Sequence, residues 1–143
     1  MHPKPAVRAI IRDPENRILF LKRANTDYLP DHWCLPGGKI DFGDSAEMAV
    51  CQEINEETGL FCTGYTFLFY RDNLPTETLA THFVTLFFEC TVTGDIVLNE
   101  ESSEFAWIAQ ENLVNYPIAF QNEEAVRKYW SEQKTNHTEN HEE

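Results

Sequence analysis

The stretch AEMAVCQEINEETGL, residues 46–60, decides the fold and raises the first question about function. At about 100° per residue, its small and aliphatic side chains gather on one arc, which is typical of a helix that packs against a sheet. Glu53 and Glu57 fall inside that arc, and Glu56 lies at its edge. Ionised carboxylates are rarely buried without partners, because desolvation costs several kcal/mol per ion. Three acids on a buried face therefore need an explanation.

Three explanations compete: a solvated helix face, ion pairs with basic residues, or divalent cations. A solvated face does not suit an arc that also carries alanine, valine and isoleucine. Ion pairs have few donors, because this stretch contains no Lys or Arg and the whole chain has only 11. The three- and four-residue spacings of the glutamates let their oxygens converge on one region, and such hard ligands suit Mg²⁺ or Mn²⁺. The cation explanation is therefore favoured, and ion pairing stays open.

The residues around this stretch mark where the helix begins and ends. Ser45, or Asp44 before it, is a suitable N-cap, and Gly59 is a usual C-terminal stop. Further upstream, Gly37 and Gly38 let the backbone approach a ligand closely, and their carbonyls are able to coordinate a cation. A glycine pair after a proline more often marks a simple turn, and the pattern alone favours that turn.

Outward from the helix, the chain alternates between strand and helix patterns. A helical spacing covers residues 121–133, and aliphatic or aromatic runs predict strands elsewhere, the fourth of them central. The strand runs are residues 6–12, 18–23, 61–70, 81–92 and 105–108. The first two are expected to form a hairpin or to be neighbours. Strands that precede, interrupt and follow helices indicate an α/β class with a mixed sheet flanked by helices.

Length and charge limit the classes of partner. A chain of 143 residues is the size of one domain, here expected over residues 1–133, with a polar, disordered tail over residues 134–143. Its 24 acids and 11 bases give a net charge of -13, which repels nucleic acids and anionic membranes. A phosphate-bearing partner would need a local bridge, such as a metal ion. No apolar run is long enough to span a bilayer, so a cytoplasmic monomer or homodimer is expected.

The residues around the helix carry a family pattern. Gly38, five residues, Asp44, seven residues and then QEINEETGL (residues 52–60) resemble the Nudix box, G-x5-E-x7-R-E-U-x-E-E-x-G-U, where U is a bulky aliphatic residue. This resemblance implies an α/β/α sandwich with a mixed β-sheet. It also implies divalent-metal-dependent hydrolysis of a diphosphate linkage in a nucleotide or nucleoside diphosphate derivative. The small-molecule substrate would be a nucleoside triphosphate, a nucleotide sugar or ADP-ribose, attacked by water at phosphorus.

The resemblance also assigns expected roles to residues. Glu53, Glu56 and Glu57 match the metal-binding glutamates, and the carbonyl of Gly38 matches a backbone ligand of Mg²⁺ or Mn²⁺. Glu56 is also a candidate general base. In this family the base sometimes comes from a later loop, which here offers three further acids: Glu100, Glu101 and Glu104.

Two departures from the box matter for catalysis. Gln52 stands at the catalytic position where the family has Arg; it donates hydrogen bonds but adds no positive charge. Asp44 replaces the first Glu of the box with a shorter carboxylate. The alternative function is therefore a catalytically weakened Nudix-fold module that binds or senses a nucleotide. Arg23 and Lys39 are the expected contacts for substrate phosphate. Three aromatic residues are candidates for stacking on a base: Tyr28, Phe42 and Phe83.

Overall fold

The computed structural model describes residues 1–142, and for residues 135–142 it describes only the backbone. Its strands are β1 (Lys4–Ile10), β2 (Ile18–Arg23), β3 (Trp33–Cys34), β4 (Gly37–Lys39), β5 (Phe61–Asn73), β6 (Phe83–Thr93) and β7 (Ser102–Ile108). Its helices are α1 (Ala46–Thr58), the 3₁₀ helix η1 (Gln110–Asn115) and α2 (Asn122–Glu142). Neither α1 nor α2 combines the length and apolar character needed to cross a membrane, over the residues described.

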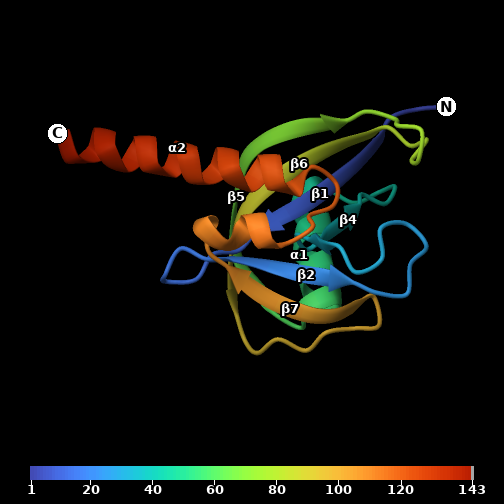
Figure 1. Cartoon of the computed structure of the whole chain (residues 1–143), viewed down its shortest axis with the longest axis horizontal. Coiled ribbons are helices and arrows are strands. Elements are labelled where there is room, and N and C mark those ends of the chain that lie inside the picture. The colour runs from blue at the N-terminus through green and yellow to red at the C-terminus, as the bar shows by residue number, and fades with distance from the viewer. Residues whose placement is uncertain (143) are drawn as a thin grey trace.

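The strands form two sheets, which Figure 1 shows between the helices. The larger is mixed, with the order β4-β1-β6-β5; β1 and β6 are parallel, and its other pairs are antiparallel. The smaller is antiparallel, with the order β3-β2-β7. The predicted α/β class, the mixed sheet and the central position of β6 are thereby confirmed.

The division into two sheets is a feature that the hydrophobic pattern does not predict. A turn joins β1 to β2, in which the Asp13 carboxylate accepts hydrogen bonds from the backbone N–H groups of Glu15 and Arg17. Beyond the single bridge between Arg12 and Ile18, the two strands enter different sheets. β1 and β2 are therefore joined by a turn, but they do not pair along their length as the expected hairpin would.

Each helix covers its own hydrophobic core, and both sheets contribute to each. Around α1, the buried side chains include Ala49, Val50, Ile54, Val7, Ala9, Leu19 and Leu21. Around α2, they include Ala125, Val126, Tyr129, Trp130, Phe20 and Phe87. Together the two cores make the α/β/α sandwich.

The structure differs from the prediction at β4 and at the end of α2. Gly37 and Gly38 form a strand rather than a turn, because their backbone pairs with β1, where they lie opposite Arg8 and Val7. α2 continues to Glu142, past the predicted helix end at residue 133, and it carries the C-terminus away from the sheets (Figure 1). The disorder expected for residues 134–143 stays a prediction, since the side chains from residue 135 and all of Glu143 lie outside the described residues.

Candidate functional site

α1 presents the three glutamates as the helical wheel predicts. The helix is capped by the Ser45 hydroxyl, which accepts a hydrogen bond from the N–H of Met48 at 3.1 Å. It ends at Gly59, which has a left-handed φ of 75° that glycine adopts without strain. Glu57 is buried at 7% exposure, whereas Glu53 is half-buried and Glu56 is exposed.

Glu53 and Glu57 form a hydrogen-bonded carboxyl pair. Burial raises the pKa of both groups, and that of Glu57 well above its ordinary value. The bond between the carboxyls acts in opposite directions on them, since it raises the pKa of Glu57 and lowers that of Glu53. Oε2 of Glu57 also accepts a hydrogen bond from the Gly37 N–H at 3.3 Å.

The glycines of β4 form a thin wall beside this pair. A Cβ added to Gly38 would lie 2.9 Å from Cδ of Glu53, and a Cβ added to Gly37 would lie 2.7 Å from Cδ of Arg8. Successive strand residues face opposite sides of a sheet. Glu53 and Arg8 therefore lie on opposite sides of the β4 backbone, with no side chain between them.

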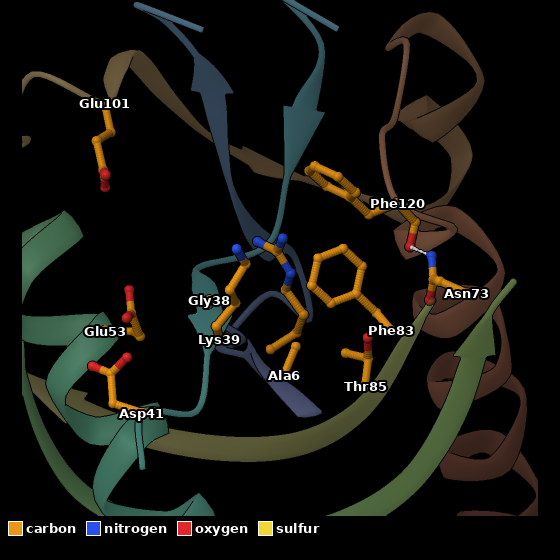
Figure 2. A pocket seen from close by; sticks show the side chains of 12 residues that line it. Ala6, Gly38, Lys39, Asp41, Glu53, Asn73, Phe83, Thr85, Glu101 and Phe120 are labelled. Atoms are coloured by element: carbon orange, nitrogen blue, oxygen red, sulfur yellow. Dashed lines mark hydrogen bonds between the residues drawn. The ribbon is translucent and has the colours of Figure 1, made fainter. Parts of the chain in front are cut away.

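A cavity of about 360 Å³ is lined by both Glu53 and Arg8, and Figure 2 shows its two ends. Acids gather at one end: Asp41, Glu53 and Glu101. Aromatic and amide side chains line the other: Asn73, Phe83 and Phe120. Lys39 lies between the two ends in the figure, and Arg8 also lines this cavity. The cavity is thus charged at one end and suited to a planar, apolar group at the other.

A second cavity, of about 510 Å³, meets the first. The two share four lining residues: Arg8, Gly37, Lys39 and Glu101. Glu57 lines the second cavity and Glu53 the first. Each cavity therefore contains one member of the carboxyl pair, and the four shared residues form the junction between the cavities.

The later loop brings one of its three candidate acids to the site. Glu101 lines both cavities, and Figure 2 shows its carboxylate on the Glu53 side. Glu104 is instead ion-paired with Lys22 at 3.0 Å. Glu100 lines neither cavity. Geometry thus distinguishes Glu101 from its neighbours.

Arg23 lies at the site but is largely engaged by its own loop. Its guanidinium donates to the carbonyl oxygens of Tyr28 at 2.8 Å and Leu29 at 3.3 Å, and to the Thr26 hydroxyl at 3.2 Å. The same group lies over the Phe120 ring, 4.6 Å from its centroid. Arg23 lines the second cavity only, so the loop it holds forms part of that wall.

The remaining predicted residues are distributed unevenly. Gln52 is exposed, and its side chain makes no hydrogen bond to any residue that the structure describes. Of the stacking candidates, Phe83 lines the first cavity, whereas Phe42 is fully exposed. Tyr28 packs near Phe120, with 5.9 Å between ring centroids.

Among the residues that line the first cavity, sequence reasoning missed Arg8, Asn73 and Phe120. Arg8 carries a usable signal, because it is a charged side chain between buried Val7 and Ala9 on β1. Asn73 and Phe120 carry none, since they meet only through a long-range hydrogen bond of 3.0 Å, from Nδ2 of Asn73 to the Phe120 carbonyl.

The carboxyl pair fits a divalent cation, although the side chains do not yet form a complete site. Within the described residues, no three His, Cys, Asp or Glu side chains are grouped as a metal site. The carboxyl groups of Glu53 and Glu57 lie together, and the Gly38 backbone is adjacent to Glu53. Glu56 is exposed one residue before Glu57 on the same helix. An all-oxygen donor set of this kind suits a hard cation.

Comparison with known families settles what kind of domain holds this site. The family described as NUDIX domain matches residues 2–129. The chain belongs to the Nudix family. It is a Nudix pyrophosphohydrolase, as the similarity to NudI and MutT enzymes also indicates.

Three relatives illustrate the similarity. The nucleoside triphosphatase NudI of Escherichia coli O81 (strain ED1a) is 29% identical over 127 residues, which cover 82% of this chain and 90% of NudI. A MutT NUDIX hydrolase from Burkholderia pseudomallei has a TM-score of 0.80 at 27% identity, covering 89% of this chain and 98% of that structure. The NUDIX domain of Shewanella oneidensis NrtR, crystallised with ADP ribose, has a TM-score of 0.77 at 19% identity, covering 93% of this chain and 90% of that domain. The last similarity concerns the fold alone.

Proposed function

We propose that this Nudix hydrolase cleaves a diphosphate linkage in a nucleotide or nucleotide derivative and needs Mg²⁺ or Mn²⁺ to do so. The observation that carries the proposal is the junction of the two cavities, which Lys39 and Arg8 line, with Glu53 in one adjoining cavity and Glu57 in the other. A phosphate chain requires cations, and a metal-activated water requires carboxylates nearby. This junction supplies side chains of both kinds.

Each residue near the junction has a proposed task. Glu53, Glu57, Glu56 and the Gly38 carbonyl would hold the cation, which when bound would neutralise phosphate charge and lower the pKa of a water molecule. Lys39 would bind substrate phosphate. Glu101 replaces Glu56 as our preferred general base, because its carboxylate lines both cavities and a base must lie within reach of the attacking water.

The first cavity supports a nucleotide as substrate. Its far end offers the Phe83 and Phe120 rings to a planar base, while the acidic end takes the phosphates. Nucleoside triphosphates come first among the candidates, since NudI is named a nucleoside triphosphatase. ADP-ribose and nucleotide sugars follow, since the NrtR domain was crystallised with ADP ribose. A cytoplasmic location and a monomeric or homodimeric state stay predictions.

The test is hydrolysis of a substrate panel with identification of the products. Purified protein with Mg²⁺ or Mn²⁺ would be given nucleoside triphosphates, nucleotide sugars and ADP-ribose. We expect release of a nucleoside monophosphate, or of phosphate from a triphosphate, and a loss of about 100-fold or more in Glu57→Gln. Glu104→Gln is the matched control, because its carboxylate pairs with Lys22 away from the cavities. Equal, trace-level rates in wild type and Glu57→Gln on every substrate would sink the proposal.

A nucleotide-binding module is the second candidate, favoured by one observation. Gln52 supplies no positive charge, is exposed and makes no side-chain hydrogen bond to the described residues. Such a module would gain thermal stability from a nucleotide without consuming it. Gln52→Arg separates the two candidates, because a weakened enzyme should gain rate from the restored arginine, whereas a repurposed pocket should not.

A further inference from the structure

Arg8 is a positively charged group at the site that comes from outside the Nudix box. It lies on β1, opposite Gly37 of β4, and its side chain lines both cavities. Nη1 donates to the Leu35 carbonyl at 2.7 Å. The guanidinium also lies over the Phe120 ring, 4.9 Å from its centroid. Two contacts from different segments therefore hold the Arg8 guanidinium in one place.

The guanidinium has donors to spare. An arginine carries five N–H groups, and one hydrogen bond from Arg8 to the described residues is seen, that to Leu35. None of its other N–H groups is buried without a partner. No acid among the described residues lies within ion-pairing distance of Arg8. In a chain with a net charge of -13, a fixed guanidinium group without an acidic partner is available to bind an anionic ligand.

The position of Arg8 relative to the carboxyl pair indicates which kind of anionic ligand Arg8 would bind. Gly37 separates it from Glu57, and Gly38 contacts Glu53 on the other side of β4. The guanidinium forms no ion pair with either carboxylate. A ligand over the β4 backbone would therefore have the cation site at one end and Arg8 at the other.

We infer that Arg8 binds the diphosphate of the substrate, holding one phosphoryl group while the Glu53–Glu57 site holds the next through its cation. The planar guanidinium matches two phosphate oxygens at once, and Lys39, which also lines both cavities, assists as a point charge. This inference rests on the proposed function, since it assumes that a diphosphate occupies the junction. Arg8 would supply a positive charge from β1. Gln52 on α1, which stands where the Nudix box has an arginine, supplies none.

The test measures binding of methylenediphosphonate, a diphosphate analogue with a non-hydrolysable carbon bridge, by calorimetry with Mn²⁺ and with EDTA. We expect Arg8→Gln to raise the dissociation constant with Mn²⁺ about tenfold or more. Arg8→Lys, which keeps the charge but loses the fork, should raise it about threefold. Arg127→Gln is the matched control, because Arg127 forms a partly exposed ion pair with Glu123 on α2 and lines neither cavity, and it should leave binding unchanged.

Two further measurements distinguish direct phosphate binding by Arg8 from a purely structural role of its side chain. Titration of Mn²⁺ alone should give the same or tighter binding in Arg8→Gln, because a nearby positive charge is lost. On any nucleotide that is hydrolysed, KM should rise more than kcat falls. If Arg8→Gln does not fold, as thermal melting would reveal, the threefold effect of Arg8→Lys carries the test.

Several outcomes would overturn the inference. These are unchanged diphosphonate binding in both Arg8 variants, a weakening of Mn²⁺ binding by the same factor, and no diphosphonate binding by wild type with Mn²⁺. Failure of the proposed function looks different. Tight, Arg8-dependent diphosphonate binding without turnover of any nucleotide would reject hydrolysis alone, whereas turnover with unchanged Arg8 variants would reject the role of Arg8 alone.

Discussion

Glu57 is a buried carboxyl at which a proton and the proposed cation would compete for the same position. Burial raises its pKa well above the ordinary 4.5, so the folded protein binds this proton more tightly than the unfolded chain does. Without metal, the contribution of Glu57 to stability is therefore greatest below about pH 4.5 and falls as pH rises through the raised pKa. The slope in that window is at most about 1.4 kcal/mol per pH unit.

Glu57→Gln should remove this pH dependence. The amide keeps an oxygen for the Gly37 N–H and donates to Glu53, without a proton to lose. We expect chemical denaturation in EDTA, from about pH 5 to 9, to show wild type losing stability relative to Glu57→Gln. Glu56→Gln, at an exposed position on the same helix, should follow wild type. Parallel curves for wild type and Glu57→Gln would contradict the buried proton, and added Mn²⁺ should stabilise wild type alone.

Site residues were predictable where a local pattern places them. Glu53, Glu56 and Glu57 follow from helical periodicity within one segment, and their graded burial agrees with it. Phe120 was not predictable, and neither was its contact with Arg8, because the two residues are far apart in the chain. Arg23 shows the converse: its position at a strand end indicated substrate contact, but its hydrogen bonds with the following loop are tertiary detail that no pattern contains.

Among the elements, β4 is the one whose lack of side chains shapes the site. Gly38→Ala should displace the Glu53 carboxylate, because the added Cβ would lie 2.9 to 3.1 Å from its three terminal atoms. We expect Mn²⁺ binding to weaken and kcat/KM to fall about 10- to 100-fold, since small misplacements of catalytic groups have effects of this size. Calorimetry and steady-state kinetics would measure both quantities.

The control for this change is Gly64→Ala on β5. There the added Cβ meets only the Thr91 hydroxyl, at 2.8 Å, which is the end of a side chain able to rotate. Activity and metal binding should stay close to wild type. If Gly38→Ala retained full Mn²⁺ affinity, contact between Gly38 and Glu53 would not matter for the cation site.

The predictability of elements follows their length. α1, β5 and β6 are long enough for the periodic spacing of their apolar residues to be recognised, and each was predicted close to its observed position. β3 and β4 have two and three residues, too few for alternation, and β4 forms only because β1 offers a partner. β7 begins at Ser102 rather than residue 105, since pairing with β2 extends it beyond its apolar core.

At the scale of the whole molecule, the divergence of the two sheets produces the junction of the cavities. The first cavity lies along the larger sheet, through residues of β1, β4 and β6, whereas the second also takes residues from β2, β3 and β7 of the smaller sheet. Binary patterning of one strand at a time does not encode this divergence. The charge of -13 makes the junction selective, because only there do Arg8 and Lys39 offset the repulsion of an anionic substrate.

The same view of the whole molecule predicts where the chain can be shortened. The buried side chains described on α2 end at Trp130, whose Nε1 donates to the Asn16 carbonyl at 3.1 Å, and Tyr129 hydrogen-bonds to Glu89 of β6. Deleting residues 135–143 should leave the melting temperature within about 2 °C of the full chain, because it removes none of these contacts. Deleting residues 129–143 should unfold the domain at ambient temperature, since each buried aromatic ring contributes about 3–5 kcal/mol. Thermal denaturation of the two truncated chains measures both effects, and a large loss of stability in the shorter deletion would show that residues 135–143 pack against the domain.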